Sequence, residues 1–165
     1  MTSKEYIKNL PFYKRLKNLL IIHEGYEYHA YKCTAGYHTI GIGYNIDAHM
    51  PEFAGKRLSL DDQEINMLFI ESLSYAIDDC FNVFKKFDEI IENNHARACA
   101  LIDMAFNLGR TRLKKFKRMV KAVNKREWQQ AAIEAQESLW FEQVGSRGVR
   151  IVEMLRTGDF CDVVK

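Results

Sequence analysis

The stretch from His23 to Tyr44, HEGYEYHAYKCTAGYHTIGIGY, decides how the chain around it folds. Apolar residues recur at helical spacing over 12–24, and Gly25 follows at the place of a left-handed C-cap. Two short pieces rich in tyrosine and threonine come next, at 28–32 and 37–42, separated by Cys-Thr-Ala-Gly. This pattern predicts a helix that leads directly into a β-hairpin.

Helical patterns dominate the rest of the chain. Residues 45–57 include a proline and a glycine and are predicted as a loop. Ser59 is predicted as the N-cap of a helix of about 25 residues, roughly 38 Å long, which can join two lobes. Further helices are predicted at 94–108, 116–123, 127–140 and 146–156.

The sequence therefore predicts an α+β fold that is mostly helical. We expect a small sheet lobe over 25–58, a linking helix over 59–84, and a helical lobe over 85–160 that also takes in the first helix, 12–24. A length of 165 residues with 47% hydrophobic and 28% charged residues fits one globular domain. Nine glycines and two prolines are too few for the turns of an all-β sandwich.

The cysteines and the lengths of the apolar runs indicate the cellular compartment in which the protein is expected to reside. The longest aliphatic run, at 19–22, is far too short for a membrane span or a secretory signal. Cys33, Cys80, Cys99 and Cys161 form no C-x-x-C pair, so we expect free thiols in a reducing compartment. Cys80 and Cys99 are expected to be small core residues.

Three polar side chains stand where hydrolytic chemistry is feasible, in the spacing E-x8-C-x5-T. Glu24 falls on the last turn of the first helix, Cys33 at the end of the first strand and Thr39 on the returning strand. The separation of Cys33 and Thr39 is even, so both side chains can face one side of the hairpin. A carboxyl opposite a second ionisable group is the minimum equipment for acid–base hydrolysis.

Each of these residues also has a purely structural interpretation. Glu24 can be a glutamate that ends a helix and pairs with an arginine. Cys33 can be a buried cysteine of a strand, and Thr39 can be an ordinary residue of a β-strand. The negative end of the helix dipole and apolar neighbours such as Leu20 instead suit a protonated Glu24 that acts as a general acid. The combination of the three residues favours a site.

Several motifs in order resemble the phage-type lysozymes, the family typified by the lysozyme of the T-even phages. The run from His23 to Tyr44 is similar to the family signature: a glutamate followed by glycine, a tyrosine-lysine strand end, and D/C-x5-T leading into T-I-G-x-G. Residues 97–109, RACALIDMAFNLG, are similar to the family's cleft helix, and Arg147, Arg150 and 156–158 match its last helix. The resemblance covers residues 12–160.

This resemblance implies a single catalytic, lysozyme-like domain over 1–165 that hydrolyses the β-1,4 bond between N-acetylmuramic acid and N-acetylglucosamine in peptidoglycan. Glu24 takes the general-acid position, and Thr39 that of the threonine that holds the water or the second catalytic group. Phe106 matches an aromatic residue of the saccharide groove, and Arg147 the arginine that pairs with the catalytic glutamate. A monomer acting on glycan strands without metal or cofactor is expected.

The chain also departs from the family pattern. Cys33 stands where the best-known members carry aspartate, although the pattern admits cysteine. A thiol has a reference pKa of about 8.5, and a neighbouring carboxylate is expected to raise the pKa of Cys33 further. The sulfur either activates water for inversion or attacks the anomeric carbon for retention. Tyr44 replaces a histidine, and Asn45, Met119 and Glu134 replace other groove residues, so subsite preferences do not transfer.

Residues 110–126 hold nine basic side chains and no acidic one. This predicts attraction to an anionic cell envelope. Phe116, Met119, Val120 and Val123 make the same segment amphipathic, and we expect them to face the core rather than a membrane. The net charge of +2 argues against a nucleic-acid partner. The competing hypothesis, a DNA-binding module, predicts tight, salt-sensitive DNA binding without wall hydrolysis.

A second alternative is a cysteine amidase or endopeptidase that uses Cys33 with His38, His49 or His95. Cys33 follows a strand instead of opening a helix, so it lacks the usual source of thiol acidity. A zinc site made of Cys33, His38 and His49 has no recognised ligand spacing. For the lysozyme, the absence of a signal peptide implies storage in the host cytoplasm until a holin-type pore opens, followed by action on the wall in the periplasm.

Overall fold

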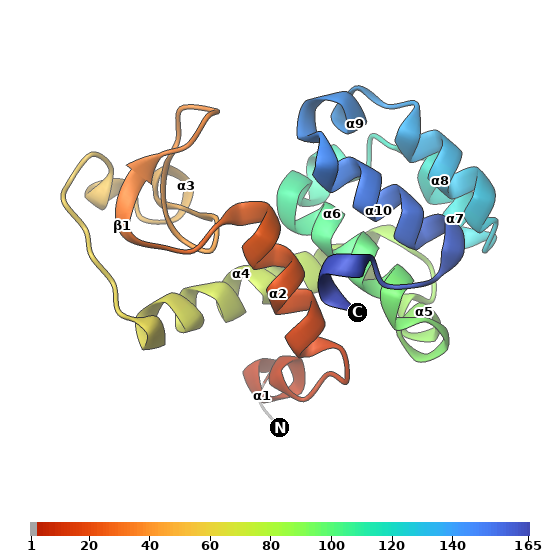
Figure 1. Ribbon diagram of the computed structural model, residues 1–165, viewed down its shortest axis with the longest axis horizontal. Helices are drawn as coiled ribbons and strands as arrows, with labels where there is room; N and C mark the ends of the chain where they lie inside the picture. Colours follow the sequence, from red (N-terminus) through yellow and green to blue (C-terminus); the bar gives the residue numbers. More distant parts are fainter. Residues whose placement is uncertain (1–2) are drawn as a thin grey trace.

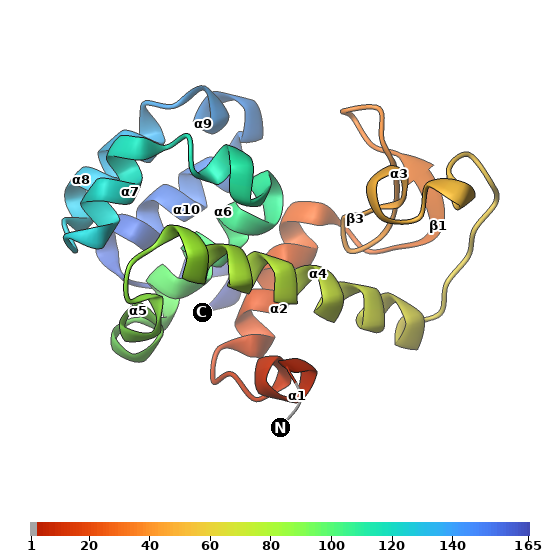
Figure 2. The same cartoon turned by 180° about the vertical axis from the view of Figure 1, so that it is seen from behind.

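The computed structural model describes residues 3–165 and shows two lobes joined by a long helix (Figures 1 and 2). The smaller lobe is built on a three-stranded antiparallel sheet in the order β1-β2-β3. Its strands are β1 (Glu27–Lys32), β2 (His38–Gly41) and β3 (Tyr44–Asn45). The expected hairpin and the α+β fold are confirmed.

The segment predicted as a loop after the hairpin is more ordered than expected. It contains β3, the short helix α3 (Ile46–His49) and the 3-10 helix η1 (Pro51–Phe53). The Asn45 side chain accepts a hydrogen bond from the backbone N–H of Ala48, so the last strand residue also caps the helix that follows. A helix of one turn is too short to leave a periodic pattern in the sequence.

The predicted N-cap of the linking helix is wrong by two residues. Ser59 lies in an extended segment that pairs with β1, since Leu60 N–H donates to the Tyr28 carbonyl and Ala30 N–H to the Leu58 carbonyl, both at 2.9 Å. Asp61 caps α4 (Asp62–Val83), in a reciprocal capping box with Glu64. The 22 residues of α4 span roughly 33 Å between the lobes.

Two tyrosines fasten the small lobe to the start of α4. The hydroxyls of Tyr26 and Tyr28 donate to the Asp62 carboxylate at 2.5 and 2.8 Å. Burial and the hydrogen bond to Asp62 raise the pKa of Tyr26 to about 12. Its hydroxyl therefore remains a donor at every physiological pH, and the attachment persists.

The helical lobe surrounds α6, which is buried on most of its faces and packs against α4, α5 and α10. Its helices are α1 (Ser3–Lys8), α2 (Tyr13–Glu24), α5 (Phe87–Asn93), α6 (His95–Leu113), α7 (Lys117–Asn124), α8 (Trp128–Gln136), α9 (Leu139–Val144) and α10 (Ser146–Thr157), followed by the 3-10 helix η2 (Asp162–Val164).

Two of the predicted helices differ from those observed. Gly109, at φ 71° and ψ 166°, interrupts α6 directly after the end of the helix predicted over 94–108, but a further turn continues to Leu113. The segment predicted as one helix over 127–140 is divided, because the Ser138 side chain accepts from the Phe141 N–H and caps α9 as a new helix. The helix predicted over 146–156 corresponds to α10, and Gly158, at φ 77°, is its C-cap.

The buried cysteines and the amphipathic helix have the structural roles that were expected of them. Cys80 and Cys99 are fully buried free thiols, and burial raises the pKa of both well above the usual value. In α7, Met119 and Val123 are buried in the main core. The apolar face of this helix therefore packs inside the protein. No helix within 3–165 combines the length and the apolar character needed to cross a membrane.

Candidate active site

Glu24 is held at the last turn of α2, where Gly25, at φ 83°, ends the helix and turns the chain into β1. The turn between β2 and β3 packs directly on its carboxyl group. A Cβ at Gly43 would lie 2.7 Å from Glu24 Oε2, and Gly43 itself has φ 63°. Only glycine allows this approach, and it leaves the Glu24 side chain 19% exposed, facing the space between the lobes.

Behind Glu24 lies a chain of charged and polar side chains joined by short hydrogen bonds. Arg147, near the start of α10, donates from Nη1 to Glu24 Oε1 at 2.7 Å and from Nε to Asp103 Oδ1 at 2.8 Å. His23 Nδ1 lies 2.7 Å from Asp103 Oδ2, and the His23 and Asp103 side chains are 1% and 0% exposed. Nearby negative charge raises the pKa of Arg147 despite the opposing effect of its burial. One guanidinium thus connects two carboxylates.

This network gives the Glu24 carboxyl a fixed orientation. Removal of one partner from a buried ion pair typically costs about 3–5 kcal/mol, because the other charge remains without compensation. Asp103 therefore anchors Arg147 independently of Glu24. His23 Nε2 has no hydrogen-bond partner within 3–165, which favours the tautomer with the proton on Nδ1, donated to Asp103.

Asp103 and His23 were missed as site residues from the sequence. His23 falls on the apolar stripe of the first helix, and its side chain is buried. Asp103 interrupts the apolar run ALIDMAF, and a charged residue within a buried helix requires a partner. That interruption was the available signal, but it does not identify the partner as Arg147, 44 residues away.

Cys33 and Thr39 lie together on the opposite wall. Tyr31 pairs with Thr39 across the hairpin, and Cys33 is two residues beyond Tyr31, so all three side chains share one face. All three line the same cleft as Glu24. The even spacing of Cys33 and Thr39 predicted this placement.

The expected direction of the Cys33 pKa shift is wrong. Burial raises the pKa of the thiol, but hydrogen bonds from the backbone N–H of Tyr37, the Thr39 hydroxyl and the backbone N–H groups of Ala35 and Gly36 outweigh burial and lower it below the usual value. The β1–β2 turn therefore favours the thiolate form of Cys33. The Thr39 hydroxyl also lies 3.1 Å from the Tyr37 carbonyl oxygen, a second acceptor for its single proton.

These walls enclose one cleft of about 620 Å³ between the lobes. The small lobe contributes Cys33 and Thr39, α2 contributes Glu24, and α6 contributes Phe106, which packs on Phe69 with 6.2 Å between ring centroids. Arg147 lies behind Glu24 instead of lining the cleft. The structure thus brings the five residues singled out from the sequence to one place, four on the surface of the cleft and one as its support.

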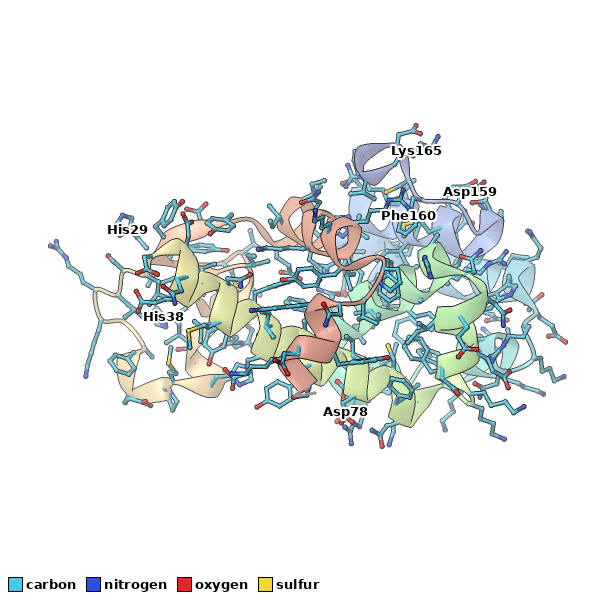
Figure 3. The ribbon with its side chains drawn as sticks, turned by 90° about the horizontal axis from the view of Figure 1, so that it is seen from below. His29, His38, Asp78, Asp159, Phe160 and Lys165 are labelled. Atoms are coloured by element: carbon cyan, nitrogen blue, oxygen red, sulfur yellow. The ribbon has the colours of Figure 1, made fainter. Side chains whose placement is uncertain are left out.

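The three histidines considered as partners of Cys33 each contact another side chain. His38 Nδ1 pairs with Asp47 at 2.8 Å, His49 stacks on Tyr75, and His95 contacts the Phe12 ring. Figure 3 shows His29 and His38 at the small-lobe end, opposite the C-terminal residues Asp159, Phe160 and Lys165. No group of three or more potential metal ligands occurs among the described residues. The arrangement supports neither a cysteine–histidine pair nor a zinc site.

A carboxyl at a helix end, facing a polar hairpin across an interlobe cleft, defines a glycosidase of the lysozyme class. The model of the phage lysozyme family matches residues 22–154, and the chain belongs to this family. It is a glycoside hydrolase of the muramidase type.

Two curated relatives come from Dictyostelium discoideum. The chain is 28% identical to probable T4-type lysozyme 1 and 30% identical to probable T4-type lysozyme 2, and each match covers 87% of this chain and 94% of the relative. It is also 28% identical to the pre-baseplate central spike protein Gp5 of Enterobacteria phage T4, over 82% of this chain and 26% of that protein.

Proposed function

We propose that this enzyme hydrolyses the β-1,4 bond between N-acetylmuramic acid and N-acetylglucosamine in peptidoglycan. The observation that carries the proposal is the Glu24 carboxyl, tied to Arg147 at 2.7 Å and exposed in the same cleft as Cys33 and Thr39. Both walls and the supporting ion pairs come from one chain, so a monomer is sufficient for activity.

In this reaction Glu24 protonates the oxygen of the leaving sugar as the glycosidic bond breaks. Arg147 stabilises the carboxylate that forms when the proton leaves, and Asp103 keeps Arg147 in position. On the opposite wall the Cys33 thiolate, held by the donors of its turn, is the second reacting group, and Thr39 positions it. The lowered pKa makes the thiolate available at a lower pH than for an ordinary cysteine.

Digestion of purified peptidoglycan tests this function. We expect new reducing ends that carry N-acetylmuramic acid, and no new amino groups, since a glycosidase breaks no amide bond. Mass analysis of the soluble fragments and assays for reducing ends and amines measure this outcome. New amines would identify an amidase or endopeptidase. The absence of both products, together with tight DNA binding, would identify a binding module.

We also propose the biological role of a phage endolysin. The enzyme would remain in the host cytoplasm until a holin-type pore opens, and would then reach the wall in the periplasm and lyse the cell. The match to the phage lysozyme family supports this role. Free cysteines at all four positions are consistent with a reducing compartment before release.

Contact with an anionic envelope is proposed for a narrower surface than the whole segment 110–126. Arg110 pairs with Asp78 and Asp79, Arg118 with Glu134, and Arg126 with Glu89. Five lysines gather at a groove between the end of α4 and α7, and one of them, Lys125, pairs with Glu127 at 3.9 Å. This lysine groove is lined by Lys85, Lys114, Lys117, Lys121 and Lys125, with no carboxylate among its lining residues.

Replacement of Lys114, Lys117 and Lys121 by glutamine is expected to flatten the decrease of the lysis rate with added salt. Long-range attraction to an anionic wall weakens as the Debye length falls from about 10 Å at 0.1 M to about 3 Å at 1 M. The measurement is the lysis rate of permeabilised cells against salt concentration, beside hydrolysis of small soluble muropeptides, which should not change. The matched control, Lys4, Lys8 and Lys14 to glutamine, removes the same charge elsewhere. An equal effect of the two triple variants would locate the attraction outside the groove.

A further inference from the structure

The cleft has an aromatic edge that takes no part in the proposed chemistry. Tyr75, on α4, is 54% exposed, and its ring lies parallel to that of His49, with 10° between the planes and 6.3 Å between the centroids. His49 comes from the small lobe, at the end of α3. Both residues line the same cleft as Glu24. We call this pair the His49–Tyr75 platform.

The platform is held from both sides of the cleft before any ligand binds. The centroids of the His49 and Tyr44 rings are 5.2 Å apart, and Tyr44 is buried in the small-lobe core with Ile40 and Ile46. Tyr75 stands on the linking helix, and its hydroxyl lies 3.4 Å from Glu71 Oε1. A preformed surface binds without the cost of ordering its side chains.

The cleft face of α4 gives the direction in which the site extends. Ser72, Tyr75, Ala76 and Asp79 all line the cleft, and their spacing puts them on one face of the helix. Seven helical residues cover about 10 Å, so a ligand that follows this face is elongated. The platform lies along this wall, continuous with the cleft that contains Glu24.

The chemistry of the platform fits a ligand with flat apolar faces and hydroxyl groups. Asp79 is neutralised by Arg110, at 2.8 Å. Tyrosine and histidine offer apolar ring faces together with a hydroxyl and ring nitrogens for hydrogen bonds. A pyranose ring has this combination, since its C–H groups form apolar faces and its hydroxyl and acetamido groups lie at the edge.

We propose that the His49–Tyr75 platform is a glycan subsite that stacks a sugar ring of the strand at a distance from the bond being cleaved. This inference rests on the proposed function, because its ligand is the same glycan strand. It adds a binding site that favours long strands over short fragments.

Tyr75→Ala is expected to raise KM about tenfold on long strands, which corresponds to about 1.4 kcal/mol of lost binding, with kcat within twofold of the unaltered enzyme. On the shortest fragment that the enzyme cleaves, which does not reach the platform, KM should be unchanged. The substrates are soluble peptidoglycan glycan oligomers with their peptide stems, fractionated by length. Tyr75→Phe keeps the ring and should retain most of the affinity for long strands.

Two controls make the result specific. Tyr6→Ala removes an exposed tyrosine from α1, outside the cleft. It should change neither the KM for long strands nor the KM for short fragments. His49→Ala should raise KM for long strands, and the double variant with Tyr75→Ala should cost less than the sum of the two single changes, because the two rings act as one surface. Alanine is favourable in a helix, so Tyr75→Ala is expected to fold.

An unchanged KM on long strands, or an equal rise on short and long substrates, would overturn the subsite. Failure of the unaltered enzyme to release reducing ends from any of the oligomers would instead contradict the proposed function.

Discussion

Glu24→Gln is expected to lower kcat for peptidoglycan hydrolysis about a thousandfold or more while the protein remains folded. Glutamine has nearly the same shape as glutamate but carries no proton that it can give to the leaving oxygen. Arg147 Nη1 can still donate to the amide oxygen in place of Oε1, and its second partner, Asp103, is unchanged. The loss should therefore appear in the chemical step and not in stability. The measurements are the release of reducing ends, the lysis of outer-membrane-permeabilised cells, and thermal unfolding.

Glu27→Gln is the matched control, since Glu27 is exposed on β1, three residues away, and has no role in the proposed reaction. It should keep full activity. The pair of variants also tests the proposed endolysin role. Cells that produce the unaltered enzyme in their cytoplasm should remain intact until the inner membrane is permeabilised and should then lyse, while cells with Glu24→Gln should not. Activity of Glu24→Gln within a few-fold of the unaltered enzyme would exclude Glu24 as the general acid.

Local patterns predicted the parts of the fold that depend on local physics. The stripe over 12–24 with Gly25 behind it placed Glu24 at a helix end, and the even spacing of Cys33 and Thr39 placed both on one face of the hairpin. Errors arose where two local signals competed. Serine and aspartate are both favourable N-cap residues, so Ser59 and Asp61 compete for this position. Because Leu58 and Leu60 pair with β1, Ser59 is held in an extended segment and the helix is capped by Asp61.

The supporting part of the site could not be read from local patterns. Glu24 and Arg147 are 123 residues apart, so only the resemblance to a family suggested that they pair. Asp103 and His23 complete the network through contacts across three helices, α2, α6 and α10. Periodicity identifies which face of a helix is buried, but it does not specify which buried charges meet.

The lowered pKa of Cys33 has the same origin. The sequence placed a thiol near a carboxyl, from which a raised pKa follows. The donors that lower it are backbone N–H groups at Ala35, Gly36 and Tyr37, and their direction depends on the backbone angles of the turn. Gly36, at φ 88°, has a conformation that favours glycine. The sequence shows that a turn is present, but not how its amides are placed relative to the sulfur atom.

Cys33→Ala is expected to lower kcat about a hundredfold or more, with the fold intact, because the cleft then lacks the group that activates water or attacks carbon. Cys33→Asp should retain substantial activity, since a carboxylate in the same turn can act as the base beside Thr39. A small thiol reagent should inactivate the unaltered enzyme, and bound chito-oligosaccharide should protect it. Cys80 and Cys99 are buried and should not react. Cys161→Ser, outside the cleft, should leave both activity and sensitivity to the reagent unchanged.

The dependence on pH separates a working thiolate from a packing cysteine. Because the pKa of Cys33 is lowered, its thiol ionises at a lower pH than an ordinary cysteine thiol does. Activity that requires the thiolate should rise with pH through this pKa, and Cys33→Asp should move that rise to lower pH, because a carboxyl ionises earlier. The first product then distinguishes the two mechanisms: the β-anomer indicates retention through a glycosyl-thioether, and the α-anomer indicates inversion by a water that the sulfur activates. Unaltered lysis by Cys33→Ala, with no effect of the thiol reagent, would show that Cys33 only packs in the hairpin and that Glu24 and a water held by Thr39 are sufficient.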